Sequence, residues 1–135
     1  MIKLTNIALW TLRVTGLVQV VLGLLFWSGH ALALVSLHMA IGMLFVLALL
    51  VLAGTAAWAR LGLAPVVLSI ALGLVIPVFG ITQTRLLPGA AHWVVRLTHL
   101  LLAMVAMGVA GRLARFTLAH PRQVPLLGGE TSALG

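Results

Sequence analysis

The chain alternates four long apolar stretches with three short segments that contain polar, glycine and proline residues. The apolar stretches cover residues 7–27, 34–58, 63–81 and 93–116. About 20 consecutive apolar residues are enough for a helix to cross the hydrocarbon core of a bilayer. The pattern therefore predicts an all-α membrane protein with four transmembrane helices.

The connections between these stretches are short, with residues 28–31 in the first, 59–62 in the second and 82–92 in the third. Connections of this length force neighbouring helices to run antiparallel. We therefore expect an up-down-up-down four-helix bundle over residues 1–120. Residues 121–135 contain two prolines and three glycines without an amphipathic period, so we expect a flexible C-terminal tail there.

Composition supports this assignment. Of 135 residues, 63% are hydrophobic and 7% charged, and the mean hydropathy is +1.27, whereas soluble domains are about 25% charged. Eight Lys and Arg against one acid give a net charge of +7. These charges punctuate apolar stretches, so we interpret them as topology signals and not as a nucleic-acid site. With no cysteine, the chain cannot ligate an iron–sulfur cluster or attach haem through thioether bonds.

Tryptophans and basic residues predict how the bundle sits in the membrane. The four tryptophans fall at the ends of the apolar stretches, where aromatic rings prefer the headgroup level. Two of them, Trp10 and Trp27, are about 25 Å apart along a helix, which matches a hydrocarbon core. One face carries Arg85 and Arg96, and the other carries Lys3, Arg13, Arg60, Arg112, Arg115 and Arg122. The positive-inside rule then predicts an inner-membrane protein with both termini in the cytoplasm.

Two histidines, His38 and His99, lie inside predicted spans. Ionisable residues in a span are functional candidates because their burial in hydrocarbon is costly. His99 lies six residues after Trp93, about 9 Å below the outer headgroup level, and His38 lies about 6 Å deep on the same scale. The helices over residues 34–58 and 93–116 run in the same direction, so the two imidazoles enter the bundle at nearly the same depth.

A bis-histidine haem b requires this arrangement, because its iron takes two axial nitrogens on opposite faces of a flat ring. Gly42 and Ala103 follow one turn after His38 and His99 and leave room for a plate-shaped ligand. Arg96 lies one turn outward from His99, where a guanidinium suits a haem propionate. We therefore interpret His38 and His99 as the iron ligands of one haem b near the outer face, with Arg96, Gly42 and Ala103 as further cofactor-binding residues.

Other residues in the spans are weaker signals. Gly23 and Gly80 fall in the same outer zone as the histidines, where they add little bulk. Gln19 lies about 12 Å from Trp27 along its helix, and a hydrogen bond between helices and a contact with a quinone are both open for it. The methionines are interpreted as lining and not as ligands; they are Met39, Met43, Met104 and Met107.

Alternative interpretations of the histidine pair remain open. The two side chains could form hydrogen bonds between helices in a cofactor-free accessory subunit of a larger membrane complex. Each could instead bind a separate chlorophyll-type or bacteriochlorophyll-type magnesium. The same haem could also serve an enzyme, such as a quinol oxidase. Zinc is disfavoured because two histidines without nearby Cys, Asp or Glu make a poor site.

The second apolar stretch contains the motif Leu37-His38-Met39-Ala40-Ile41-Gly42 and ends in Trp58-Ala59-Arg60. It resembles the His-x-x-x-Gly helices of the small bacterial four-helix cytochrome b family, which is similar to the membrane cytochromes of hydrogenases and formate dehydrogenases. The resemblance covers this stretch and, more loosely, residues 93–116. It implies haem ligation by His38 and His99. It also implies electron transfer to or from a quinol, or to or from a membrane or periplasmic redox partner. Family members commonly hold two haems, whereas the inner half of these spans contains no histidine, so the resemblance implies one haem here.

Overall fold

The computed structural model of the chain describes residues 1–119, and these form an all-α structure without strands. Its four long helices are α1 (Ile2–Trp27), α2 (Val35–Trp58), α3 (Leu63–Thr82) and α4 (His92–Ala119). All four are long and apolar enough to cross a membrane. The predicted four-helix membrane fold is therefore confirmed, while the predicted tail, residues 121–135, lies outside the described residues.

The helices extend beyond the apolar stretches at the end of the bundle that holds the N-terminus. There α1 begins at Ile2 and not at residue 7, and α4 continues to Ala119 and not only to residue 116. The hydroxyl of Thr5 donates a hydrogen bond to the Met1 carbonyl within the first turn of α1. Hydropathy marks the hydrocarbon core of the bilayer, whereas a helix can continue through the headgroup region with polar side chains.

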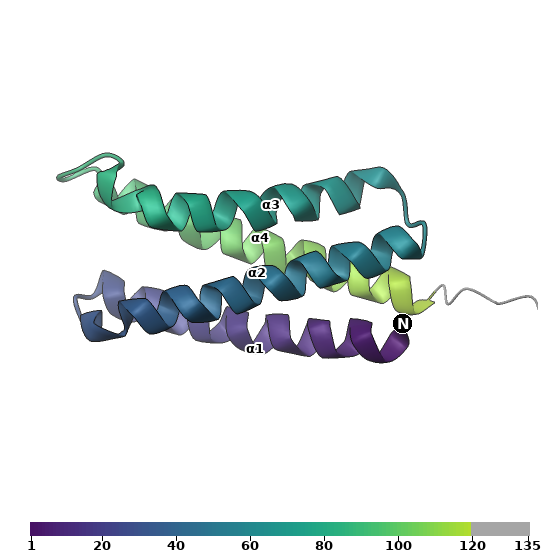
Figure 1. Cartoon of the computed structure of the whole chain (residues 1–135). Helices are drawn as coiled ribbons and strands as arrows, with labels where there is room; N and C mark the ends of the chain where they lie inside the picture. Colours follow the sequence, from purple (N-terminus) through teal and green to yellow (C-terminus); the bar gives the residue numbers. More distant parts are fainter. Residues whose placement is uncertain (120–135) are drawn as a thin grey trace, which may run out of the picture.

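The connections give the predicted up-down-up-down order. Short 3-10 turns at Leu32–Leu34 and Gln83–Arg85 belong to the α1–α2 and α3–α4 connections, which lie together at one end of the bundle (Figure 1). The N-terminus, the α2–α3 connection and the end of α4 lie at the other end. The α2–α3 connection closes at Gly62 with a φ of 89°, a conformation that side-chain-bearing residues rarely adopt.

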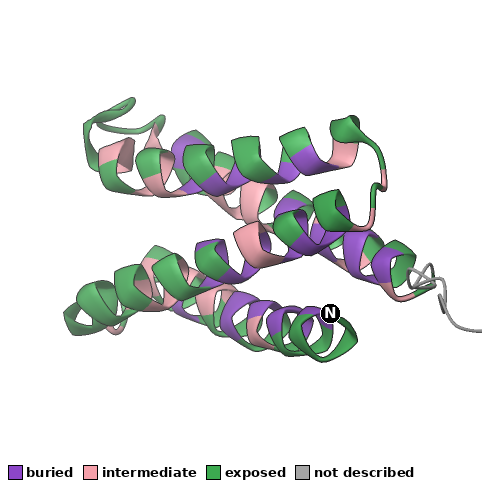
Figure 2. Cartoon of the chain, turned by 45° about the vertical axis from the view of Figure 1, so that its right-hand side comes forward, coloured by how far each residue is buried: buried purple, intermediate pink, exposed green. Residues whose placement is uncertain are grey.

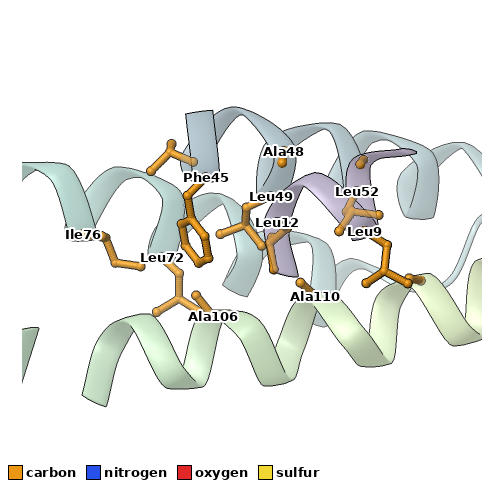
Figure 3. Packing of buried hydrophobic residues seen from close by; sticks show 13 residues of the cluster. Leu9, Leu12, Phe45, Ala48, Leu49, Leu52, Leu72, Ile76, Ala106 and Ala110 are labelled. Atoms are coloured by element: carbon orange, nitrogen blue, oxygen red, sulfur yellow. The ribbon is translucent and has the colours of Figure 1, made fainter. Parts of the chain in front are cut away.

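The tightly packed core lies toward the end of the bundle that holds the N-terminus. Leu12 of α1 and Leu49 and Leu52 of α2 are at most 1% exposed, and they meet Ala106 and Ala110 of α4, which are fully buried (Figure 3). Small residues let helix backbones approach closely, and in a bilayer such van der Waals packing drives helix association. This half of the bundle is therefore the part in which the four helices pack closely together.

Packing is looser at the opposite end. Residues 23–44, 77–94 and 96–105 include no buried side chain, although they cover parts of all four helices. Buried positions gather toward the N-terminal end of the bundle, and exposed and intermediate ones dominate the other end (Figure 2). Both span histidines lie within these loosely packed segments.

The tryptophans lie on the outside of the bundle. Trp27, Trp58 and Trp93 lie at helix ends, as predicted, whereas Trp10 lies within α1 because that helix begins at Ile2. Trp10, Trp58 and Trp93 are each more than half exposed, and Trp27 is partly exposed. The Arg13 guanidinium lies 5.5 Å from the centre of the Trp10 ring, so its charge stays beside an interfacial side chain. These placements fit a multi-pass membrane protein.

Candidate functional site

The loosely packed end of the bundle contains a cavity of about 460 Å³, lined by residues of all four helices. Cavities that bind cofactor-sized ligands have volumes of about 300–1,000 Å³. The lining includes all five residues that the sequence places at a cofactor site, namely His38, Gly42, Arg96, His99 and Ala103. Gly23 and Gly80 also line it.

Polar side chains are few in this lining and lie at different depths. His92 and Arg96 are in the first two turns of α4, close to the α3–α4 connection, and Thr84 lies in that connection. Gln19 lies near the middle of α1. Between them the lining is mainly aliphatic and aromatic, apart from the two histidines. A ligand that fits would be apolar through most of its body and charged or polar at its outer edge.

His38 enters the cavity from the first turn of α2. Its ring makes an edge-on contact with Phe26 of α1, with 5.3 Å between centroids and an interplanar angle of 71°. Its Nδ1 atom is buried and has no hydrogen-bond partner among the described residues. The imidazole is therefore oriented by an aromatic contact and not by a polar one.

His99 enters the cavity from α4, two turns after the start of that helix. Its ring is stacked with Phe79 of α3, with 6.1 Å between centroids and an interplanar angle of 11°. A Cβ atom added to Gly80 would lie 3.2 Å from His99 Cε1, so the ring occupies space that the missing side chain leaves. Its Nδ1 atom is also buried and unpartnered within residues 1–119.

The unpaired nitrogens distinguish between two interpretations of the histidine pair. Within the described part of the chain, neither imidazole forms a hydrogen bond, although polar groups in protein interiors are almost always paired. An unpaired buried donor or acceptor costs about 1–3 kcal/mol. A purely structural role as hydrogen bonds between helices therefore has no bond to support it, whereas a bound group that uses these nitrogens would remove the cost.

The histidines form a two-ligand set. Residues 1–119 bring together no group of three or more His, Asp or Glu side chains that could hold a metal ion. The two imidazoles line the same cavity. Two nitrogen ligands suit a metal whose other positions are filled by a macrocycle, which is the case for haem iron. The donor set and the cavity are thus compatible with a haem.

Gln19 makes the hydrogen bond between helices that was one of its two predicted roles. Its Nε2 donates to the backbone carbonyl of His38 at 2.9 Å. A Cβ atom on Gly42 would lie 2.5 Å from this Nε2, so Gly42 leaves room for the Gln19 amide as well as bordering the cavity. This role of Gly42 is additional to the one predicted from the sequence.

The methionine prediction is partly wrong. Met39 and Met43 line the cavity, but Met104 and Met107 do not. Met104 is half exposed. Met107 lies deeper, where a Cβ atom on Gly16 would come within 2.5 Å of its sulfur. Met107 follows Ala103 by four residues and so lies on the same face of α4, one turn deeper than the cavity, whereas Met104 is rotated away from that face.

The remaining histidines and Arg85 lie at different places relative to the cavity. His92 lines the cavity, and its Nδ1 donates a hydrogen bond to the Leu86 carbonyl at 3.2 Å. Arg85 is exposed and does not contribute to the lining, and His30 is exposed with a contact to the Ser28 hydroxyl. His120 lies outside the described residues.

Arg96 is exposed at the end of the cavity nearest the start of α4. The only acid of the chain, Glu130, lies outside the described residues, so no carboxylate within residues 1–119 can pair with this guanidinium. A carboxylate on a bound ligand could therefore pair with Arg96 in two parallel hydrogen bonds.

Sequence reasoning missed the two phenylalanines. Phe26 and Phe79 come from the helix that precedes each histidine helix along the chain. Nothing in the sequence pattern separates them from the many other apolar residues near span ends.

The comparisons with known protein families, curated proteins and solved structures find no match. The site is therefore interpreted from its own geometry, beside the short motif at residues 37–42.

Proposed function

We propose that this protein is a membrane cytochrome b, or the cytochrome b subunit of a larger complex, that holds one haem b between α2 and α4 near the outer face. It would transfer electrons to or from a quinol or a redox partner protein. One observation carries the proposal: two imidazoles from different helices, each with a buried and unpaired nitrogen, line a single cavity of cofactor size.

In this proposal His38 and His99 hold the iron through one ring nitrogen each. When bound, haem supplies one-electron chemistry. The aliphatic and aromatic lining excludes water and lowers the local dielectric constant, which helps to set the reduction potential. Phe26 and Phe79 keep the two rings oriented, so little reorganisation is needed when a ligand binds.

Arg96 would bind the propionate edge of the haem. Carboxylates are costly to leave in hydrocarbon, so they are expected to point toward the outer end of the cavity, where Arg96 and His92 lie. A guanidinium at this place stabilises carboxylates and also favours the electron-rich state of a neighbouring redox group.

The alternative functions have less support. A cofactor-free accessory subunit would use the histidines as hydrogen bonds between helices, yet neither imidazole is hydrogen-bonded within the described chain. Two separate chlorophyll-type pigments would need two pockets, whereas both histidines line the same cavity. One shared ligand therefore explains the site better than two.

We also propose an inner-membrane location with both termini in the cytoplasm. Within residues 1–119, Arg85 and Arg96 belong to the outer end of the bundle, and the other end carries Lys3, Arg13, Arg60, Arg112 and Arg115. The cofactor site would then face the periplasmic side, within reach of a periplasmic redox protein or a membrane partner. Quinol, which is soluble in the bilayer, is the small-molecule candidate.

The proposal is tested by replacing each ligand in turn. His38→Ala and His99→Ala should each abolish the low-spin haem spectrum, because each removes one of the two residues that would hold the iron. His30→Ala, at an exposed position outside the cavity, is the matched control and should retain the wild-type spectrum. Visible absorption spectra of the purified reduced proteins provide the measurement. Full low-spin haem content in either span variant would rule out that histidine as a ligand.

A further inference from the structure

The side-chain amide of Gln19 links α1 to the backbone of α2 at His38 through a hydrogen bond. Gln19 lies near the middle of α1, and its Nε2 donates to the His38 carbonyl at 2.9 Å. The bond crosses the interface between two helices, where polar side chains act as specific links in membrane proteins. The amide therefore fixes α1 against the helix segment that presents His38 to the cavity.

This contact depends on a gap in α2 at Gly42. A Cβ atom at that position would lie 2.5 Å from Gln19 Nε2, well below the roughly 3.5–4.0 Å at which non-bonded atoms pack. Gly42 comes one turn after His38, where its N–H donates to the same carbonyl in a regular α-helix. The His38 carbonyl thus accepts one bond from its own helix and a second from Gln19.

The other polar atom of the amide is unused. Gln19 Oε1 is buried and has no hydrogen-bond partner among residues 1–119, and the same holds for His38 Nδ1. An amide oxygen accepts hydrogen bonds, and a protonated ring nitrogen donates them. Histidines that ligate a metal through one nitrogen almost always donate the other N–H to a carboxylate, a carbonyl or water. No carboxylate is present in residues 1–119, and Gln19 Oε1 belongs to the amide that already contacts His38.

We propose that Gln19 is the positioning residue of His38, an inference that rests on the proposed haem site. Its Nε2 holds the His38 backbone, and its Oε1 accepts the ring N–H of His38 when the other ring nitrogen binds iron. Gly42 is needed for this arrangement, because a side chain at position 42 would overlap the Gln19 amide. An acceptor on the ring N–H makes the imidazole a stronger electron donor, which stabilises oxidised iron and lowers the reduction potential.

Two substitutions remove the Gln19–His38 interaction in different ways. Gln19→Met keeps a side chain of similar length but removes both hydrogen-bonding atoms. Gly42→Ala leaves the glutamine intact and displaces its amide. Gly54→Ala is the matched control, because it makes the same change on the same helix at a position where an added Cβ meets nothing within 4 Å.

The midpoint potential and the haem affinity of the purified holoprotein are measured by redox titration and by haem titration. Q19M and G42A should keep a low-spin spectrum, raise the midpoint potential and weaken haem binding about tenfold, as is typical for loss of a hydrogen bond to a metal ligand. The double variant should raise the potential no further than the larger single effect, because both changes remove one interaction. G54A should match the wild type.

Each other outcome counts against a defined part of the account. If Q19M and G42A bind haem at the wild-type potential, even with weakened affinity, Gln19 has only a packing role and the inference fails while the proposed function stands. Additive or opposite shifts in the double variant would also overturn it. If the wild-type protein binds no haem, the proposed function is wrong, and the inference, which depends on it, is wrong as well. If one variant does not fold, the sign of the shift in the other still decides.

Discussion

The imidazole of each candidate haem ligand packs against an aromatic ring from the preceding long helix. Phe26 contacts His38 edge-on, and Phe79 stacks on His99. Neither ring competes for the imidazole nitrogens, so the side chains are oriented while their nitrogens stay available. A binding site whose side chains are held in place before the ligand arrives loses less conformational entropy on binding.

The residue types and their depth were predictable, but their neighbours were not. The spacing of His38 and His99 from the interfacial tryptophans already predicted two imidazoles at one level, and both line one cavity. The contacts with Phe26, Phe79 and Gln19 depend on how each helix is rotated about its axis. In a chain that is apolar on nearly every helix face, no hydrophobic period fixes that rotation.

Replacing Arg96 tests the orientation of the haem. Arg96→Gln removes a positive charge at the outer end of the cavity, which destabilises the electron-rich reduced state relative to the oxidised one. We expect the midpoint potential to fall by an amount on the order of tens of millivolts, with an unchanged low-spin spectrum. Redox titration in detergent measures the shift. Arg85→Gln, outside the cavity, should have a smaller effect, and an unchanged potential in the Arg96 variant would remove this residue from the site.

At the scale of the helices, one half of the bundle is packed and the other half is hollow. In α4, Ala106, Ala110 and Ala114 are fully buried against the core. Their spacing of four residues is visible in the sequence and indicates close packing on one side of the inner half. The cavity itself could not be predicted. It is left where side chains of all four helices do not fill the space between them, and this depends on how the helices pack.

Gly80 on α3 offers a test of this hollow half. Gly80→Leu would place a branched side chain against the His99 ring, where even a Cβ lies 3.2 Å from Cε1. We expect it to displace haem while the folded bundle persists, because the packed core lies in the other half. Haem content and helical circular dichroism are measured together. Gly108→Leu, at a position open to the surroundings, is the control and should keep its haem, and normal haem content in the Gly80 variant would contradict the placement of the site.

At the scale of the whole molecule, the candidate site lies toward one end of the bundle. The four histidines within residues 1–119 are His30, His38, His92 and His99, and all lie in the half of the bundle that holds the α1–α2 and α3–α4 connections. The hydrocarbon core is about 30 Å thick, so one site near the outer face does not by itself connect the two faces. This arrangement fits a subunit that exchanges electrons at one face with a partner.

The orientation of the bundle is tested with reporter fusions. A fluorescent protein fused to the C-terminus should fluoresce, and a periplasm-dependent phosphatase at the same place should be inactive, because basic residues concentrate at that end. A phosphatase inserted after Gly29, in the α1–α2 connection, should be active. The reverse pattern would invert the topology and place the site at the cytoplasmic face.

The most direct measurement is the visible spectrum of the purified wild-type protein, with its haem content per chain. The account predicts a Soret band, sharp α and β bands after reduction, and one haem b per polypeptide, because the chain has a single pair of histidines at one depth in its spans. A visible region without bands, in protein purified from cells that make ample haem, would contradict the account and favour a cofactor-free subunit.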